Sequence, residues 1–371
     1  MGYEETMKTD YLIIGAGLFG ATCARILSDA GYRCLVLEKR NHVGGNCHTE
    51  SWDGITIHKY GPHIFHTDDQ QAWDFANRYA EFMPFTLQVV AKSGDKMYNL
   101  PFNMWTFHQL YGSITPEQAR KDIAAHCDFS GEAVTIEQAA LKKIGRPAYE
   151  LLVKPYTEKQ WGMPASELPR QIIDRLPVRF TYDNNYFNDR YQGIPKHGYT
   201  AMIENMLMGI EVRFGVDFVA DKEFWQNRTV QVIYTGPIDR YFDYKLGSLD
   251  YKSVSHVHTM IETANYQGAP VVNLPDHPHY TRCIEHKHFA KERMDDAITW
   301  VSHETPVAYI PDKTDAMYPV NDYRNNELYK RYVEMTNHMT NVHFGGRLGS
   351  YKYYDMDDTI INAMKLCAEL L

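Results

Sequence analysis

Three glycines near the N-terminus have the spacing of a nucleotide-binding turn. They form the pattern Gly15-x-Gly17-x-x-Gly20, directly after an apolar run at residues 11–14. In such a turn the first glycine permits the bend, the second lets backbone approach a pyrophosphate, and the third lets helix and strand pack closely. The pyrophosphate would lie at the N-terminus of the following helix, where unpaired N–H groups favour anions. The pattern predicts dinucleotide binding, with a purely structural glycine turn as the alternative.

An acidic residue and a second glycine turn follow. Glu38 ends the next apolar run, where it can accept a hydrogen bond from a ribose hydroxyl. Just beyond it, Arg40-x-x-x-Gly44-Gly45-Asn46 offers a second point of close backbone approach. NAD and FAD share the first motif. The second turn favours FAD, as if two turns enclosed one long cofactor, and a loop that merely needs permissive residues is the alternative.

Two histidines lie in a low-charge stretch, Gly61-Pro62-His63-Ile64-Phe65-His66-Thr67. An imidazole titrates near neutrality and could face a redox ring. From the residues alone, His63 fits this role and that of a packed structural histidine equally well. For His66 they favour a core or loop histidine.

Rings and cations interleave at residues 154–162, 176–180 and 184–187. Planar rings can stack on a base, and arginines can bind a diphosphate with bidentate hydrogen bonds. Composition alone favours a packed aromatic patch over a nucleotide site in these segments.

Composition excludes several classes of protein. The chain has 371 residues and a net charge of -9, so we expect two or three structural units and no general attraction to nucleic acid or anionic membrane. Six cysteines are scattered without a C-x-x-C pair, and no histidines are spaced as zinc ligands beside them. No apolar run approaches the ~18 residues of a membrane span. We expect a reduced, cytoplasmic protein without a metal site.

The motifs require a particular frame. A strand at 11–14, a helix ending near Ala30 and a strand at 34–37 would form a β-α-β unit, which later strands at 231–237 and 341–344 would extend. Helical spacing runs from 106 to 168, and a terminal helix is expected at 359–370. Residues 178–191 and 251–310 alternate apolar and polar side chains, which predicts an antiparallel sheet.

The predicted fold class is therefore α/β, with a discontinuous Rossmann-like FAD domain, a helical insertion domain and an antiparallel β-sheet domain. The expected boundaries are 1–80 with 205–245 and 320–371 for the FAD domain, 102–176 for the helical domain, and 81–101 with 177–204 and 246–319 for the sheet domain.

The order of these motifs resembles that of the bacterial UDP-galactopyranose mutases from end to end. The matching segments include Tyr156 to Gly162, Leu176 to Phe180, Tyr280-Thr281-Arg282, Glu285-His286-Lys287, Tyr318-Pro319, Phe344 to Arg347, and Tyr353 to Met356. The resemblance implies a glutathione-reductase-like FAD domain and isomerisation of UDP-galactopyranose to UDP-galactofuranose without net redox change. It further implies that N5 of the reduced flavin attacks the anomeric carbon as UDP leaves, and that the sugar ring opens and recloses on a covalent flavin-sugar intermediate. The product would serve as a furanose donor for surface polysaccharide.

The resemblance also assigns roles to residues. It places on FAD the residues Gly15, Gly17, Phe19, Gly20, Glu38, Lys39, Gly45, Asn46, His63, Ile64, Gly346, Arg347, Asp355 and Met356. It places on the substrate Tyr156, Thr157 and Trp161 near the uridine, and Tyr186, Asn273, Tyr318 and Tyr353 near the sugar or phosphates. Arg175 and Arg282 would face each other across the diphosphate, and with His63 they are the catalytic candidates. Arg179 is expected to have a structural or surface role.

Two positions depart from the family pattern. Leu87 stands where members commonly have an asparagine that contacts the sugar, and Leu151 and Leu152 stand where many have a phenylalanine near the uracil, so Leu152 is included among the substrate residues. An apolar residue in place of a hydrogen-bonding partner suits a less hydroxylated sugar. The alternative is therefore a dTDP-fucopyranose mutase on the same scaffold.

Two alternatives from other classes also stay open. A flavin amine oxidase would share the FAD domain but needs no diphosphate clamp, and an inactive nucleotide-binding module would not need both Arg175 and Arg282. We expect a UDP-sugar or dTDP-sugar as the small-molecule partner, and a homodimer as the assembly.

Overall fold

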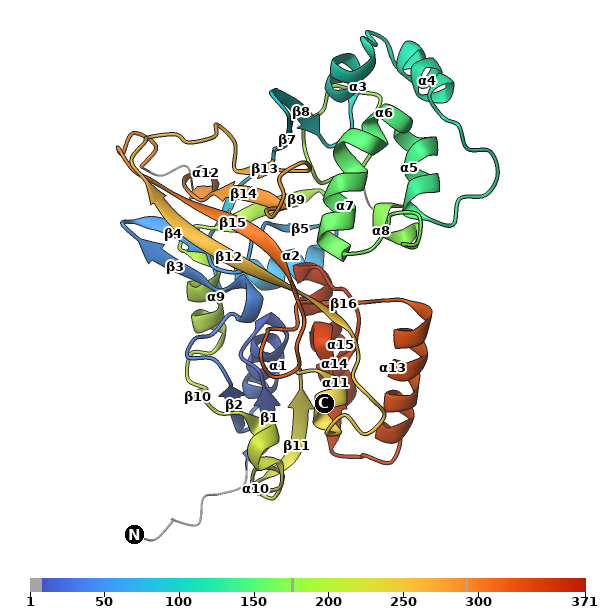
Figure 1. Cartoon of the computed structure of the whole chain (residues 1–371). Helices are drawn as coiled ribbons and strands as arrows, with labels where there is room; N and C mark the ends of the chain where they lie inside the picture. The colour runs from blue at the N-terminus through green and yellow to red at the C-terminus, as the bar shows by residue number, and fades with distance from the viewer. Residues whose placement is uncertain (1–8, 175–176, 291–292) are drawn as a thin grey trace.

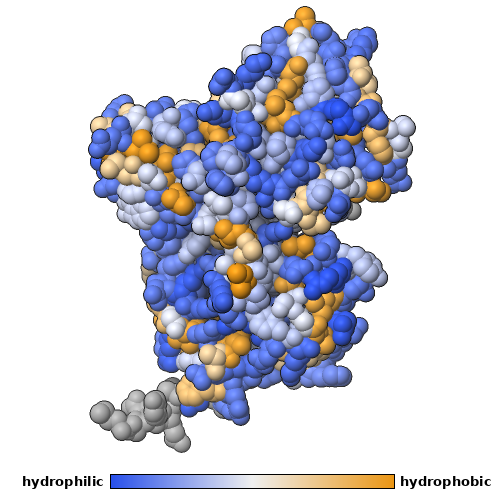
Figure 2. Space-filling view, in the orientation of Figure 1, coloured by the Kyte–Doolittle hydropathy of each residue, from blue (hydrophilic) through white to orange (hydrophobic). Residues whose placement is uncertain are grey.

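The computed structural model describes residues 9–174, 177–290 and 293–371. A parallel sheet with its helices forms the lower body in Figure 1, a helical lobe lies above it, and a mixed sheet joins the two. In the space-filling view the visible surface is mainly hydrophilic, and the molecule is narrower between the lobe and the body (Figure 2).

The parallel sheet has five strands drawn from distant parts of the chain. Their order is β10 (Glu211–Phe214), β2 (Cys34–Glu38), β1 (Thr9–Ile14), β11 (Thr229–Tyr234) and β17 (Val342–Phe344). All neighbouring pairs are parallel. The predicted strands near residues 11, 34, 231 and 341 are therefore confirmed as members of one sheet, whereas β10 was not predicted.

Both faces of this sheet are covered, which explains why its strands are apolar throughout. Ile13 and Val36 pack on the side of α1 (Leu18–Asp29), α9 (Gly198–Met206) and α15 (Met356–Leu370). Leu12 and Leu35 pack on the other side, against α11 (Ile238–Tyr241) and α13 (Tyr323–Thr336). The alternation follows from the two-residue period of a strand. The predicted terminal helix is confirmed as α15, which lies beside α1.

The second sheet is mixed rather than purely antiparallel. Its order is β16 (Tyr318–Pro319), β12 (Tyr251–Ile261), β15 (Thr299–Ala308), β14 (Arg282–Glu285), β13 (Val271–Asn273), β7 (Val89–Ser93) and β8 (Lys96–Leu100). Every pair is antiparallel except β13 with β7, which run parallel. The prediction of an antiparallel sheet holds for most of the pairs and is wrong for that one.

The strands predicted at 178–191 are absent from the described structure, where the segment is almost entirely irregular. Its backbone carbonyls are occupied by a side chain: the Arg179 guanidinium donates to the carbonyls of Asn185 and Phe187. The first regular strand in this part of the chain is β9 (Tyr191–Pro195), which pairs with β5 (Phe65–Thr67) and β6 (Phe82–Pro84).

The helical lobe matches the predicted helical stretch. Its helices are α3 (Met104–Tyr111), α4 (Pro116–Ala125), α5 (Ile136–Ile144), α6 (Arg146–Ala148), a π-helical turn (Tyr149–Val153), α7 (Lys154–Trp161) and α8 (Gln171–Asp174). Polar side chains begin several of them, as where the Thr135 hydroxyl accepts from the Gln138 amide at the start of α5. The remaining elements are η1 (Gly45–Cys47), β3 (Thr49–Trp52), β4 (Ile55–His58), α2 (Gln70–Asn77), η3 (Phe218–Asp221), α10 (Lys222–Gln226), α12 (Lys287–Ala290) and α14 (Gly346–Gly349).

Candidate functional site

A cavity of about 560 Å³ opens at the carboxyl ends of β1, β2 and β11. This is the edge at which open parallel sheets bind ligands, and the volume lies in the roughly 300–1,000 Å³ typical of small-molecule sites. The first glycine turn, the second glycine turn and residues 346–348 all contribute to its lining.

The first glycine turn needs its glycines. Gly15 has a φ of +105°, and a Cβ added to it would lie 2.3 Å from Thr235 Oγ1. A Cβ at Gly20 would lie 2.0 Å from the Gly15 carbonyl oxygen. Helix α1 starts just after Gly17 without a side-chain cap, and its first turn lines the cavity. Its N-terminal N–H groups can therefore bind an anionic group.

The second glycine turn lies directly against the first. The Gly44 amide donates to the Ala16 carbonyl at 2.9 Å. A Cβ on Gly45 would lie 3.1 Å from Gly17 Cα, so the two backbones touch where both line the cavity. The prediction that two glycine turns meet at one site agrees with this arrangement.

Glu38 is held rigidly at the end of β2. Its Oε2 accepts from the Ala16 amide at 2.7 Å and its Oε1 accepts from the Arg40 amide at 2.8 Å. Each carboxylate oxygen has a second lone pair, so Glu38 can still accept from a ligand hydroxyl in the cavity.

Most residues predicted for FAD line this one cavity: Gly15, Gly17, Phe19, Gly20, Glu38, Lys39, Gly45, Asn46, His63, Gly346, Arg347 and Met356. Ile64 is buried in the apolar core shared by the mixed sheet and the helical lobe. Asp355 is the residue before α15, next to the lining residue Met356.

Sequence reasoning missed part of the cavity wall. Arg240 forms a bidentate ion pair with Asp217, at 2.8 and 2.6 Å, and both residues line the cavity with Thr235. Thr235 lies within the predicted strand and turn at 231–237, which was a usable signal. The Asp217–Arg240 ion pair joins two segments that are apart in the sequence, so no local sequence pattern predicts it.

His63 is held in a neutral state beside the cavity. Its Nδ1 lies 2.8 Å from the Gly61 carbonyl, which can only accept, so Nδ1 carries the hydrogen. Burial, helped by the nearby Arg347, lowers the pKa of His63 to about 4 although the Gly61 contact opposes this shift. Near pH 7 Nε2 is therefore a hydrogen-bond acceptor.

A second group of side chains surrounds Arg282 at the start of β14. Its Nη2 donates to the Tyr156 hydroxyl of α7 at 2.6 Å, and its Nε lies 3.1 Å from Glu304 Oε1 on β15. Glu304 is 5% exposed and also accepts from the Thr281 hydroxyl at 2.8 Å. The Nε–Glu304 contact is an ion pair without hydrogen-bond geometry, so the bond to Tyr156 engages one of the five guanidinium N–H donors and leaves capacity for an anionic ligand.

The Arg282–Glu304 pair is ionised despite its burial. Burial alone would raise the pKa of Glu304, but Arg282, together with His256 and Thr281, lowers it to about 2. Burial likewise opposes the charge on Arg282, and Glu304 more than offsets this, so the pKa of Arg282 lies above its ordinary value. Arg282 is thus a permanent cation with a fixed orientation.

Helix α7 is tied to the sheet that carries Arg282. The Lys159 ammonium donates to the carbonyls of Leu274, Pro275 and Tyr280, at 2.7, 3.0 and 2.9 Å. This contact holds Tyr156 opposite Arg282. Lys159 and Glu304 were not predicted as site residues; Lys159 lies inside a singled-out motif, whereas nothing in the sequence marks Glu304.

Two tyrosines connect the Arg282 group to the cavity. Tyr318 and Tyr353 stack with ring centroids 5.8 Å apart, and the Arg347 guanidinium lies 5.3 Å from the first ring and 4.7 Å from the second. Arg347 also lines the cavity. Burial raises the pKa of Tyr318 to about 12, so its phenol is neutral and can donate a hydrogen bond.

The other predicted substrate residues are distributed around this group. Asn273 is the register partner of Arg282 in the β13–β14 pair, and the Tyr186 amide donates to the Leu87 carbonyl at 3.0 Å. Trp161 ends α7, and its carbonyl accepts from the Lys252 ammonium at 2.6 Å. Leu87, Leu152 and Thr157 are buried.

Two predicted arginines remain to be placed. Arg175 lies outside the described residues. Arg179 is only 13% exposed and holds the 178–191 segment together through Asn185 and Phe187, so its structural role is confirmed and the surface role is wrong.

Comparison with known proteins identifies the family. The family model of UDP-galactopyranose mutase matches residues 151–353, and that of an NAD(P)-binding Rossmann-like domain matches residues 13–79. A probable UDP-galactopyranose mutase of Klebsiella pneumoniae is 38% identical over 97% of this chain and 94% of its own length. A dTDP-fucopyranose mutase of Escherichia coli is 36% identical, with 97% of both chains covered.

This chain belongs to the UDP-galactopyranose mutase family. Among solved structures, a reduced UDP-galactopyranose mutase superposes with a TM-score of 0.75 at 14% identity, over 98% of this chain and 95% of that one. A putrescine oxidase variant reaches 0.60 at 14% identity, over 98% and 99%. Likeness at such identity shows the fold alone. The amine-oxidase alternative therefore rests on fold only, whereas the mutase family rests on sequence.

Members of the mutase family are FAD-dependent isomerases, and the cavity fits that cofactor. The two glycine turns meet backbone to backbone, and a Cβ at Gly17 would meet nothing but Gly45 within 4 Å, so it would project into the cavity. An uncapped helix N-terminus and the acceptor Glu38 provide the contacts that a pyrophosphate and a ribose require. Within the described part of the chain, no helix has the length and apolar character needed to cross a membrane.

Proposed function

We propose that this protein interconverts UDP-galactopyranose and UDP-galactofuranose at a site between the FAD cavity and Arg282. The observation that carries the proposal is the position of Arg282, a half-buried permanent cation held by Glu304 and Tyr156 and connected to the cavity through Tyr318 and Arg347. The near full-length similarity to the Klebsiella relative supports the choice of substrate.

In this proposal Arg282 binds the diphosphate and stabilises the negative charge that develops as UDP leaves. Tyr156 orients Arg282 and contributes a hydroxyl to the same group. Arg175 would act from the opposite side. Trp161 provides a ring for the uracil, and the neutral phenol of Tyr318 donates to the sugar or a phosphate.

The proposed cofactor contacts follow the lining of the cavity. The turn from Gly15 to Gly20 holds the pyrophosphate, Glu38 accepts from the ribose, and Gly45 with Asn46 closes the second turn. His63 lines the cavity, and in this proposal its Nε2 accepts a hydrogen bond from the flavin. When bound and reduced, FAD supplies the electron-rich centre that reacts with the anomeric carbon, and this chain positions the sugar and the leaving group around it.

A dTDP-fucopyranose mutase is the second candidate. The two relatives differ little in identity, 38% against 36%, so overall similarity does not separate them. Leu87, whose carbonyl holds the Tyr186 amide, has no side-chain hydrogen-bonding group. An apolar side chain at the sugar would favour a 6-deoxy hexose.

We also propose a cytoplasmic location, which all six cysteines support because they are free thiols.

Turnover of matched substrates tests the proposal. The dithionite-reduced protein is incubated with UDP-galactopyranose, UDP-fucopyranose, dTDP-galactopyranose and dTDP-fucopyranose, and pyranose and furanose forms are separated by chromatography. We expect the highest kcat/KM for UDP-galactopyranose. A higher value for dTDP-fucopyranose would establish the second candidate, and no furanose from any substrate would refute both.

A further inference from the structure

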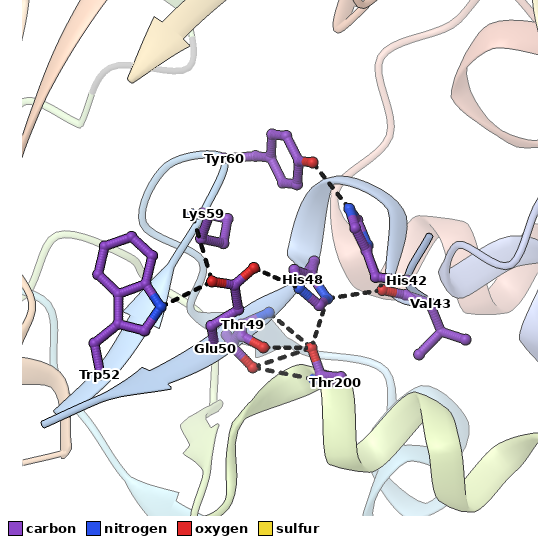
Figure 3. A network of polar contacts seen from close by, with 9 residues as sticks. All are labelled: His42, Val43, His48, Thr49, Glu50, Trp52, Lys59, Tyr60 and Thr200. Atoms are coloured by element: carbon purple, nitrogen blue, oxygen red, sulfur yellow. Dashed lines mark hydrogen bonds and ion pairs between the residues drawn. The ribbon is translucent and has the colours of Figure 1, made fainter. Parts of the chain in front are cut away.

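A network of polar contacts ties the residues on either side of the second glycine turn to one another and to Thr200 of α9 (Figure 3). Its centre is His48, which is 6% exposed and follows η1 directly. His48 is not among the residues that line the cavity. Any effect of His48 on a cofactor must therefore pass through the residues it holds.

His48 cross-links both ends of the turn to a distant helix. Its Nδ1 lies 2.9 Å from the Val43 carbonyl and 2.9 Å from Thr200 Oγ1 on α9. The Val43 carbonyl can only accept, and the Thr200 hydroxyl donates to the Thr49 carbonyl, so Nδ1 carries one hydrogen that the two oxygens share. Thr200 Oγ1 also accepts from the Thr49 amide at 2.8 Å. Val43, before the two glycines, and His48 and Thr49, after them, are thus all held at Thr200 of α9 or at its hydrogen-bond partner.

The same ring supports the cavity wall by a second route. His42 stacks on His48 with centroids 3.7 Å apart, and its Nε2 lies 2.9 Å from the Tyr60 hydroxyl. The Arg40 guanidinium lies 4.5 Å from the Tyr60 ring centroid and donates to Asn46 Oδ1 at 3.2 Å. Arg40 and Asn46 line the cavity, so the path from His48 ends at cofactor-facing side chains.

We propose that His48 is a positioning residue for FAD, which fixes the Gly44–Gly45 turn against Gly17 without touching the cofactor. Gly44 and Gly45 have φ values of +95° and +55°, and glycines lose more conformational freedom on ordering than any other residue. A turn already ordered in the apo-protein avoids that loss when FAD binds. The contacts of His48 with Val43, Thr200 and His42 hold the turn in this conformation. This inference rests on FAD binding alone and is independent of the sugar substrate.

The test measures FAD affinity in protein from which the flavin has been removed. We expect His48→Ala to raise the Kd for FAD at least about 10-fold, mainly through faster dissociation, since a buried hydrogen-bonding group is lost. Flavin fluorescence reports both the Kd and the dissociation rate. His343→Ala is the control: this histidine is half-buried in the parallel-sheet domain and hydrogen-bonded to Gln231 at 2.9 Å, but lies away from the turn. It should leave the Kd within about 2-fold.

Conservative variants separate positioning from general destabilisation. His48→Asn can place an amide N–H near the Nδ1 position and should recover most of the affinity, whereas His48→Gln places its amide further out and should not. Thr200→Val removes the anchor on α9 and should weaken FAD binding with His48 intact, which keeps the proposal testable if His48→Ala does not fold. Unchanged FAD affinity and dissociation in His48→Ala, or in Thr200→Val where His48→Ala does not fold, would overturn the proposal. Equal weakening by His48→Asn and His48→Ala would also overturn it.

Discussion

Replacing Glu304 by glutamine removes the charge that orients Arg282 while keeping the size of the side chain. The ordinary pKa of 4.5 and the value of about 2 in the folded protein differ by about 2.5, which corresponds to about 3 kcal/mol of stabilisation at neutral pH. Glu304 is 5% exposed, so solvent screens this interaction little. Nearly the whole amount should be lost in Glu304→Gln.

Urea unfolding at several pH values measures that loss. The pKa of Glu304 is depressed in the folded state, so its stabilisation is fully present above about pH 4.5 and disappears as the pH falls towards 2. The difference between the parent protein and Glu304→Gln should therefore be about 3 kcal/mol at pH 7 and shrink steadily below pH 4.5.

Turnover should fall along with stability. Arg282 keeps its charge in Glu304→Gln but loses its fixed orientation, and misplacement of a catalytic group costs up to about 100-fold. We expect kcat to drop by about 10- to 100-fold in a folded, FAD-loaded protein. Glu327→Gln is the matched control, because Glu327 is a half-exposed glutamate paired with Lys330 on α13. The reasoning is refuted if Glu304→Gln matches Glu327→Gln in both unfolding free energy and turnover.

Three further predictions concern other residues. Arg282→Ala, and equally Arg175→Ala, should lower kcat about 10²- to 10³-fold with normal flavin content, because in the proposed function each arginine stabilises the charge that develops as UDP leaves. Leu87→Asn should shift the ratio of kcat/KM for UDP-galactopyranose over dTDP-fucopyranose upwards by about 10- to 200-fold, measured by product chromatography. Burial lowers the pKa of His58 to about 3, so as the pH falls below about 6.5 this histidine is protonated in the unfolded chain but not in the folded protein. The free energy of unfolding therefore decreases by about 1.4 kcal/mol for each pH unit below about 6.5. His58→Asn should therefore flatten the fall of unfolding free energy between pH 6.5 and 4.

Each of these has a clear failing result. Arg331→Ala, at an exposed site on α13, is the control for the arginine variants, and equal turnover in Arg331→Ala and Arg282→Ala would contradict the diphosphate role. A substrate ratio unchanged by Leu87→Asn would mean that Leu87 does not touch the sugar. The same pH slope in His58→Asn and the parent protein would show that His58 does not hold off a proton in the folded state.

Local patterns predicted the nucleotide-binding part of the fold because its requirements are local. The turn from Gly15 to Gly20 is dictated by contacts that a Cβ would violate, and the flanking strands are apolar because both faces are covered. The sequence also predicted that two glycine turns enclose one cofactor, and the structure adds that Gly45 lies directly against Gly17.

The remaining features depend on partners far away in the chain. Glu304 pairs with Arg282 on the neighbouring strand, and Asp217 pairs with Arg240. The two members of each pair are far apart in the sequence, so no local pattern includes both. The 178–191 segment alternates like a strand, but the Arg179 guanidinium takes the carbonyls that a sheet would need. Ile64 was placed on FAD by resemblance, and its contact with the cofactor stays a prediction.

The domain boundaries stay a prediction. Most of helix α9, up to residue 204, falls within the unit predicted to hold the antiparallel sheet, yet the helix packs on α1 of the nucleotide-binding unit and anchors the second glycine turn through Thr200. Because α9 packs on elements of both predicted units, its contacts do not mark a boundary between them.

The dependence of isomerisation on the flavin redox state tests the central claim most directly. Furanose formation from UDP-galactopyranose is followed anaerobically with the same protein in its oxidised and its dithionite-reduced form. A mutase that needs the electron-rich reduced flavin should form product only after reduction, with no net consumption of reductant per turnover. Equal rates in the two forms, or oxidation of the flavin in step with product, would contradict the account.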